Sequence, residues 1–220
     1  MINIAIDGPS GAGKSSIAKI LAKKLTYTHL DTGSMYRAVA YKAMMNHLDI
    51  ENEDVIVDML KDTDIRLTND GKIYLDDTDV SDMIRTNEIS LLASNVSKHA
   101  KVRKDLVSRQ QKMALNKGVI MDGRDIGTVV LKDAEVKIFL TASTIKRAQR
   151  RYLQNQQLNI ASDLDQLIKE IEQRDYQDTH RAASPLVKAS YAIEIDSSDI
   201  TIDEVVDKIL EIVNRKVNVK

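Results

Sequence analysis

The chain has no cysteine, no tryptophan, one phenylalanine, two prolines and eight glycines in 220 residues. Without cysteine it cannot form disulfides, thiolate zinc sites or a cysteine nucleophile. Average usage would give about fifteen glycines and about eleven prolines. The scarcity of these turn-forming residues predicts a helix-rich fold, in which each remaining glycine or proline needs its own explanation.

An excess of charge is also missing, since 32 Lys and Arg offset 33 Asp and Glu and leave a net charge of −1. This balance argues against a generic nucleic-acid-binding protein, so we expect no nucleic-acid partner. No apolar run approaches the roughly 18 residues of a membrane span, and the first residues lack the pattern of a secretory signal. We therefore expect a cytoplasmic protein that is not associated with a membrane.

What the sequence does contain is an alternation of short apolar strands with amphipathic helices. Apolar strands separated by helices are typical of a parallel sheet flanked by helices, an α/β fold. Capping patterns at Ser162…Asp165 and Thr201…Glu204 predict the starts of two helices. The predicted strands span 2–6, 119–121, 136–140 and 191–195. Predicted helices span 34–48, 53–62, 89–116, 144–157 and 163–180, and two more begin at 14 and after 201. The region 89–116 could be one helix or two helices separated by a break.

Two segments interrupt this alternation. Residues 65–67 and 73–75 alternate about Asn69-Asp70-Gly71, which predicts a hairpin. We therefore interpret 31–112 as an insertion between core strands, and the Arg-rich helical stretch 144–185 as a second one. The core would then consist of residues 1–30, 113–143 and 186–220.

The segment Gly8-Pro9-Ser10-Gly11-Ala12-Gly13-Lys14-Ser15 fits the phosphate-loop pattern G-x-x-x-x-G-K-[ST], between an apolar strand and an amphipathic helix. Glycines let backbone N–H groups surround a phosphate, and the helix N-terminus adds partial positive charge. Lys14 can reach the β- and γ-phosphates, and the Ser15 hydroxyl can bind Mg²⁺. An ordinary glycine-rich turn is the alternative, but the complete pattern favours nucleotide binding by this loop and the following Ser16.

The loop alone does not separate kinases, GTPases and motor ATPases. The nearest approach to the guanine-reading pattern N-K-x-D is Asn116-Lys117-Gly118-Val119, which lacks the Asp. We interpret it as a helix that ends at Gly118. This disfavours a nucleotide-dependent switch, although a switch and a kinase for some other small acceptor both remain alternatives.

A second candidate site follows the strand at 119–121. Asp122-Gly123-Arg124-Asp125 lies where open α/β sheets bind their ligands, and Asp122 suits a water-mediated contact to Mg²⁺. Arg174, Asp178 and Arg181 share one helix face. An exposed ion-pair ladder is the alternative for these three residues, but Pro185 ends the helix close to them and two phosphate groups need cations.

Two further arginines, Arg147 and Arg151, fall one helical turn apart in the second insertion. They could stack on adenine or bind a phosphate of ATP, or they could form an exposed basic face. The four histidines show no metal-ligand spacing, and we interpret His29 as structural and His180 as a bystander.

The chain resembles the bacterial cytidylate kinases, which are P-loop nucleoside monophosphate kinases, over essentially its whole length. The segments that carry the resemblance are Ile6-Asp7-Gly8-Pro9-Ser10-Gly11-Ala12-Gly13-Lys14, Asp31-Thr32-Gly33-Ser34-Met35-Tyr36-Arg37, Asp122-Gly123-Arg124-Asp125-Ile126-Gly127-Thr128, and Arg174-Asp175 to Arg181-Ala182-Ala183-Ser184-Pro185-Leu186. The resemblance implies a parallel-sheet core, a monophosphate-binding domain that corresponds to 31–112 and a mobile lid that corresponds to 144–185. We expect a monomer.

The resemblance also implies a set of residues that bind CMP. Arg37 would hold its phosphate, while Ser94, Arg103 and Asp125 would face cytosine. A carboxylate suits the N4 amino group of cytosine and would repel the carbonyl of uracil at that place. The full implied set is Thr32, Tyr36, Arg37, Ser94, Arg103, Gly123, Arg124, Asp125, Arg174, Asp178 and Arg181.

The activity implied is transfer of the γ-phosphate of ATP to CMP or dCMP, which gives CDP or dCDP in pyrimidine nucleotide metabolism. The catalytic cations would be Lys14, Arg124, Arg174 and Arg181. Mg²⁺ would accompany ATP, bound by Ser15 and, through water, by Asp122.

Overall fold

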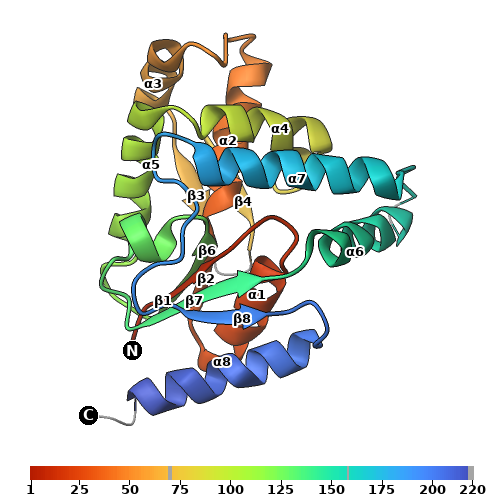
Figure 1. Ribbon diagram of the computed structural model, residues 1–220. Helices are drawn as coiled ribbons and strands as arrows, with labels where there is room; N and C mark the ends of the chain where they lie inside the picture. The colour runs from red at the N-terminus through yellow and green to blue at the C-terminus, as the bar shows by residue number, and fades with distance from the viewer. Residues whose placement is uncertain (69–70, 158, 218–220) are drawn as a thin grey trace.

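A five-stranded parallel sheet lies at the centre of the molecule (Figure 1). The computed structural model describes residues 1–68, 71–157 and 159–217. In the order β2-β6-β1-β7-β8, the strands are Thr28–Asp31, Val119–Gly123, Ile4–Asp7, Val136–Thr141 and Ile193–Asp196. The predicted parallel α/β fold is confirmed.

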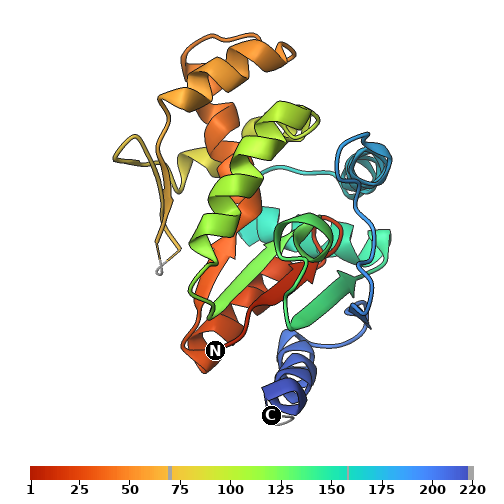
Figure 2. The ribbon, with the colours of Figure 1, turned by 90° about the vertical axis from the view of Figure 1, so that its left-hand side faces the viewer.

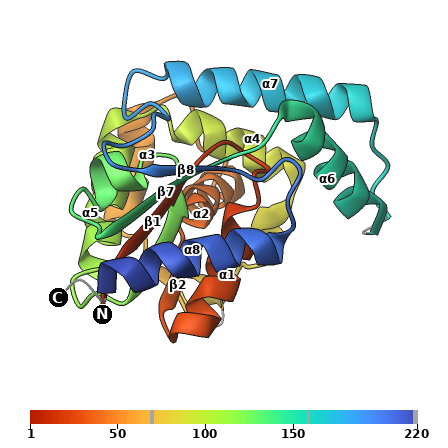
Figure 3. The same cartoon turned by 60° about the horizontal axis from the view of Figure 1, so that its bottom comes forward.

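The two faces of this sheet are covered by different elements. Successive strand residues point to opposite faces, so Ile4 and Ile6 of β1 pack with helices α1 (Lys14–Leu25) and α8 (Ile202–Val217). Figure 3 shows these two helices side by side below the sheet. Ala5, between them in the chain, packs on the other face against the short helix η2 (Ile126–Val130).

A second body of helices rises above the carboxyl ends of the strands (Figures 1 and 2). It has a separate cluster of buried apolar side chains and a three-stranded antiparallel sheet. The separate core supports the predicted insertion, although the boundaries 31–112 remain a prediction. Its elements are α2 (Thr32–Met45), α3 (Glu53–Lys61), β3 (Ile65–Leu67), β4 (Ile73–Leu75), β5 (Thr78–Asp79), η1 (Met83–Arg85), α4 (Asn87–Val96) and α5 (Ala100–Met113).

The predicted hairpin is confirmed in its strands. Ile65 pairs with Leu75 and Leu67 with Ile73 in antiparallel register. Of the predicted turn, Asn69 and Asp70 lie outside the described residues, and Gly71 has a φ of +84°, in the left-handed region that glycine tolerates.

Helices α6 (Thr144–Gln157) and α7 (Leu164–His180) pack on one another at the side of the molecule (Figure 1). Their bounds agree with the predicted helices. The assignment of 144–185 as a lid remains a prediction. Across the described ranges, no helix combines the length and apolar character that a membrane crossing requires.

Several predicted boundaries are wrong. Strand β8 begins at Ile193, because Tyr191 takes a positive φ of 61° and is 99% exposed. Strand β1 begins at Ile4 and includes Asp7. The cap of α7 is Asp163, whose carboxylate accepts the Gln166 N–H at 2.8 Å; Ser162, predicted as the cap, lies one residue too early.

The helical region predicted over 89–116 does contain a break, since it forms α4 and α5, but α5 ends earlier than expected. α5 ends at Met113, with Ala114 as its cap, so Gly118 does not end a helix. Lys117 and Gly118 both take positive φ values, 56° and 75°, in the turn that leads into β6. The strand β2 has no counterpart among the predicted strands.

Candidate active site

The phosphate loop connects β1 to α1, as the sequence pattern predicts. A Cβ at Gly8 would lie 2.0 Å from the carbonyl oxygen of Leu140, so only glycine fits there. Gly13 precedes α1 with a φ of 92°, in the left-handed region. The Lys14 side chain folds back over the loop and donates to the carbonyl oxygen of Pro9 at 2.7 Å.

Lys14 lies in a strongly charged setting. Burial, together with the nearby Arg124 guanidinium, lowers the pKa of Lys14 to about 7, against the opposing effect of the Asp122 carboxylate. The amine of Lys14 is therefore only partly protonated near neutral pH, and a nearby anion would favour its protonated form. A phosphate group at this place would restore its full charge.

Asp122 is the meeting point of three side chains at the end of β6. Its carboxylate accepts from the Ser15 hydroxyl at 2.7 Å and contacts the His29 Nε2 at 2.6 Å. The Thr32 hydroxyl donates to its backbone carbonyl at 2.8 Å. Strand register explains the grouping, because Asp31 of β2 pairs with Asp122, which also lies opposite Ile6 of β1.

Ser15 and Asp122 together fit a magnesium ion. A hydroxyl and a carboxylate are hard oxygen donors, and Mg²⁺ is commonly held by one or two protein oxygens together with substrate phosphates and water. Among the described residues, no three His, Asp or Glu side chains form a cage for a metal. The site therefore suits a metal that arrives with a nucleotide.

An arginine is held in place near the start of α2. Asp31 caps the helix, accepting from the Ser34 N–H at 3.2 Å and from Arg37 Nη2 at 2.8 Å. Burial alone would raise the pKa of Asp31, but Arg37 and the Ser34 hydroxyl lower it to about 2. The carboxylate therefore holds the Arg37 guanidinium beside the end of the sheet.

Asp125 lies between two guanidinium groups. Arg103 of α5 contacts one carboxylate oxygen, and Arg181 lies 3.8 Å from the other. The Arg103 guanidinium also lies over the Tyr36 ring, 5.3 Å from its centroid. Elements far apart in the sequence thus bring together four of the predicted substrate residues: Tyr36, Arg103, Asp125 and Arg181.

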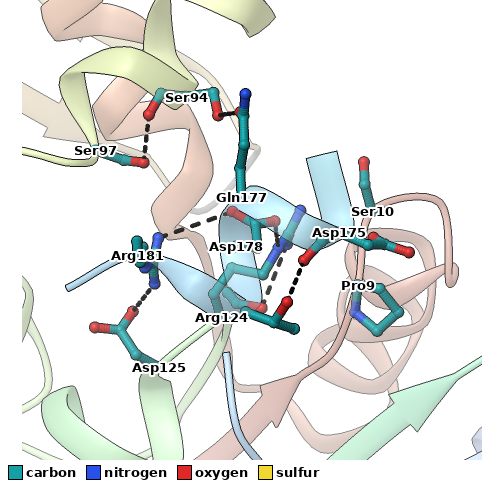
Figure 4. A network of polar contacts seen from close by, with 12 residues as sticks. Pro9, Ser10, Ser94, Ser97, Arg124, Asp125, Asp175, Gln177, Asp178 and Arg181 are labelled. Atoms are coloured by element: carbon teal, nitrogen blue, oxygen red, sulfur yellow. Dashed lines mark hydrogen bonds and ion pairs between the residues drawn. The ribbon is translucent and has the colours of Figure 1, made fainter. Parts of the chain in front are cut away.

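The predicted face of α7 turns inward, toward the same site (Figure 4). Arg124 Nε donates to Asp178 at 2.7 Å, and Arg181 lies 3.9 Å from Asp178. Burial would raise the pKa of Asp178, but Arg124 and Arg174 hold it below its usual value. The side chain of Asp178 is 8% exposed, so these residues do not form an exposed ladder.

Four arginines of the site have buried N–H donors that find no hydrogen-bond acceptor within the described part of the chain. The atoms are Arg37 Nε, Arg103 Nε, Arg174 Nε and Arg181 Nη2. Unpartnered buried donors are costly, and those of a guanidinium are suited to phosphate oxygens. Burial, with Arg124 nearby, also lowers the pKa of Arg174 to about 10. The cluster is therefore suited to bind an anion such as a phosphate group.

Ser94 and the two candidate ATP-side arginines are engaged with protein partners. Ser94 of α4 donates to Gln177 of α7 at 3.0 Å (Figure 4). Arg147 is buried and donates to the Ser10 carbonyl at 2.9 Å and to Asp175 at 3.1 Å. Arg151 donates to Asn87 at 2.6 Å. Arg147 thus braces the phosphate loop against α7, and contacts of Arg147 and Arg151 with ATP remain predictions.

Comparison with known proteins gives a consistent result. A sequence model of the cytidylate kinase family matches residues 4–215. The chain belongs to the cytidylate kinase family. Cytidylate kinases of Bacillus cereus (strain ATCC 10987 / NRS 248) and Bacillus subtilis (strain 168) are each 50% identical to it, over 97% and 98% of this chain and 96% and 97% of theirs.

A solved structure shares the fold of this cytidylate kinase family member at low sequence identity. A crystal structure of an uncharacterized protein from Eubacterium ventriosum superimposes with a TM-score of 0.51 at 13% identity. The match covers 97% of this chain and 99% of the other.

Several residues of the site in this family member have contacts that no sequence pattern indicates. Asp31 holds Arg37, and His29, which we interpret as structural, contacts Asp122. Asp175 and Gln177 make contacts from α7 to Arg147 and Ser94. The packing of α7 beside α6 and its contact with α4 bring these partners together, so spacing along the chain carries no signal for them.

Proposed function

We propose that this chain transfers the γ-phosphate of ATP to the 5′-phosphate of CMP or dCMP, giving ADP and CDP or dCDP. Family membership supports the reaction class. The observation that carries the proposal is that the phosphate loop and a buried cluster of arginines and carboxylates lie at one end of the sheet. Lys14 lies in the phosphate loop, and Asp125 lies between Arg103 and Arg181 on the other side.

The phosphates of the two nucleotides would lie between these groups. Lys14 and the phosphate-loop N–H groups would bind the β- and γ-phosphates of ATP. Arg37, with its unpartnered Nε, would bind the phosphate of CMP. Arg124, Arg174 and Arg181 lie around Asp178, so they would neutralise the charge on the transferring group.

The reaction needs no strong general base, because the acceptor is already a phosphate oxyanion. That oxygen forms a bond to the γ-phosphorus while the bond to the β–γ bridging oxygen breaks, and ADP leaves. Positioning and charge stabilisation are the main tasks of the protein. A magnesium ion, held with ATP by Ser15 and by Asp122 through water, would neutralise phosphate charge.

The base would be recognised at Asp125. Its carboxylate can accept the N4 amino group of cytosine, and Arg103 and Ser94 can donate to the N3 and O2 acceptors. Uracil presents a carbonyl at position 4, so two sets of lone pairs would face each other. The Arg103 and Arg181 guanidiniums hold the Asp125 carboxylate from two sides.

The domains would divide this work. Residues 31–112 would bind the monophosphate, and 144–185 would form a lid that excludes water and so limits hydrolysis of ATP. The hydrogen bond from Ser94 to Gln177 lies between these two segments. Because its substrates are free nucleotides, the enzyme would work in the cytoplasm. It would act as a monomer.

An acceptor panel tests the proposal. The chain is incubated with ATP, Mg²⁺ and CMP, dCMP, UMP or AMP, and the nucleoside diphosphate formed is measured. We expect CMP and dCMP to be phosphorylated fastest. Faster phosphorylation of UMP or AMP than of CMP would contradict the recognition of cytosine at Asp125.

A further inference from the structure

Asp7 is a buried acid to which the mechanism above gives no role. It is the last residue of β1, directly before the phosphate loop, and is 3% exposed. A buried carboxylate requires hydrogen-bond partners. The partners of Asp7 lie more than a hundred residues away in the sequence, so no local pattern indicates them.

Both carboxylate oxygens of Asp7 accept backbone N–H groups. Oδ1 accepts from Ile126 and Oδ2 from Gly127, each at 2.7 Å. These are the two residues directly after Asp125. They begin the short helix η2, whose first N–H groups have no helical partners of their own. The side chain of Asp7, which lies on β1, therefore caps the N-terminus of η2.

The peptide group between Asp125 and Ile126 is fixed at both of its ends. Its N–H donates to Asp7. Its carbonyl oxygen, which belongs to Asp125, accepts from Val129 at 2.9 Å and from Val130 at 3.2 Å. Holding this peptide plane fixes the direction of the Asp125 Cα–Cβ bond, and hence where its carboxylate lies relative to Arg103 and Arg181.

The charge of Asp7 is maintained against its surroundings. Burial raises the pKa of Asp7, and the N–H groups of Gly127 and Ile126 oppose that effect. With smaller contributions from the Asp125 carboxylate, which raises the pKa, and from Lys14, which lowers it, the pKa of Asp7 is about 6. At neutral pH the side chain is thus mainly a carboxylate, able to accept both N–H groups.

We infer that Asp7 is a positioning residue for recognition of the acceptor base, acting through the backbone on Asp125. This inference rests on the proposed function, because it assumes that Asp125 contacts the base. It also links the strand that enters the phosphate loop to the turn on the acceptor side. Asp7 itself touches no substrate in this account, since both of its oxygens are bonded to the turn.

The substitution Asp7→Asn tests the inference, because it keeps the shape and removes one acceptor. The Michaelis constants for CMP and for ATP are measured separately, together with the ratio of kcat/KM for CMP to that for UMP. Loss of a charge-assisted hydrogen bond predicts a rise of about tenfold or more in KM for CMP, with KM for ATP changed by less than about twofold. The CMP-to-UMP ratio should fall.

Two further measurements complete the test. Asp133→Asn removes the charge of an exposed acid just beyond η2 and should leave all these constants unchanged. Hydrogen exchange of the Ile126 and Gly127 amides should be faster in Asp7→Asn than in the wild type. If Asp7→Asn does not fold, Asp7→Ser, which still accepts one N–H, is measured in its place.

The outcomes separate this inference from the proposed function. If the wild type prefers CMP to UMP but Asp7→Asn raises both Michaelis constants equally, or neither, the positioning role is wrong. Slow amide exchange in a folded Asp7→Asn protein would contradict it as well. If the wild type shows no preference for CMP, the proposed function fails first, whatever the variant does.

Discussion

At the scale of single residues, Lys14 shows how burial and charge prepare a side chain for its ligand. Its ammonium is surrounded by protein and lies near the Arg124 guanidinium, so its pKa falls to about 7. A bound polyphosphate would offset both effects, because its negative charge favours the protonated form. The lysine thus gains its full charge only together with the nucleotide.

This predicts that ATP binding takes up a proton above neutral pH. At pH 8 a lysine with a pKa of about 7 is about 90% neutral, so binding should take up about 0.9 proton per site. Uptake should shrink as the pH falls below 7, because the lysine is then already charged. Calorimetry in buffers of different ionisation enthalpy measures it.

Lys14→Met is the control for that experiment and should abolish the uptake. A wild-type protein that binds MgATP at pH 8 without taking up a proton would show that the pKa of Lys14 is not lowered.

Removal of the Lys14 charge should also reduce catalysis. Lys14→Ala is expected to lower kcat by about two to three orders of magnitude, the usual effect of losing one charge-stabilising donor. The far-ultraviolet circular dichroism and the unfolding midpoint should stay close to those of the wild type. A near-normal rate would rule out the assignment of this loop to ATP.

At the scale of secondary-structure elements, α6 and α7 are held to the phosphate loop by one side chain. Arg147 of α6 donates to the Ser10 carbonyl of the loop and to both oxygens of Asp175 of α7. A Cβ at Gly11 would lie 3.2 Å from the Arg147 Cβ, so the loop and the helix pack closely. Any motion of α7 is therefore coupled to the loop.

Asp175→Asn should loosen this connection. We expect KM for ATP to rise a few-fold and ATP hydrolysis in the absence of acceptor to increase, because α7 would cover the site less completely. Steady-state kinetics and release of phosphate without CMP measure both effects. Glu172→Gln, on the exposed side of α7, is the control. Equal behaviour of the two variants would contradict the coupling.

The last helix depends on a local feature that the sequence does reveal. Thr201 and Glu204 form a capping box: Glu204 N–H donates to the Thr201 hydroxyl at 3.2 Å, and Thr201 N–H to the Glu204 carboxylate at 2.7 Å. Thr201→Ala should lower the unfolding midpoint by about 2–4 °C, measured by calorimetry. Ser190→Ala, at an exposed position, should not change it, and an unchanged midpoint in Thr201→Ala would contradict the cap.

The strands differ in how clearly the sequence predicts them. Strands with three or more buried apolar residues, such as β6, were predicted from the sequence. β2 was missed, because its sequence Thr-His-Leu-Asp has one apolar residue and its existence depends on pairing with β6. The sequence pattern predicts Ser162 as the cap of α7, whereas the hydrogen bond from the Gln166 N–H shows that Asp163 is the cap.

The residues of the site also differ in how clearly the sequence predicts their positions. The phosphate loop follows from its motif, since strand, loop and helix are contiguous. The meeting of Arg103, Asp125 and Arg181 depends on α5, β6 and α7, and it was expected only from the resemblance. Asp7 contacts the start of η2 and His29 contacts Asp122 of β6, so neither composition nor spacing indicates these contacts.

At the scale of the whole molecule, the structure consists of a sheet core and a separately packed helical body, with α6 and α7 beside them (Figure 2). Ser94 and Gln177 join the predicted monophosphate-binding segment to the predicted lid. Two substrates that must be enclosed together would favour closure of these parts on one another.

The lack of cysteine makes this closure measurable, since introduced cysteines would be the only labelling sites. Spin labels at Glu170 of α7 and Lys208 of α8, both exposed, should report a changed distance when ATP and CMP are added together. Labels at Lys23 of α1 and Lys208 of α8, two helices that pack against the central sheet, should report no change in distance. An unchanged first distance would contradict a mobile lid.

The central claim is that Asp125 selects cytosine for phosphoryl transfer. The most direct test is the ratio of kcat/KM for CMP to kcat/KM for UMP, measured in the wild type and in Asp125→Asn. We predict a wild-type ratio of at least about ten and a much smaller ratio in the variant, whose amide can also donate to the uracil carbonyl. A wild-type ratio near one, or a ratio that Asp125→Asn leaves unchanged, would contradict the claim.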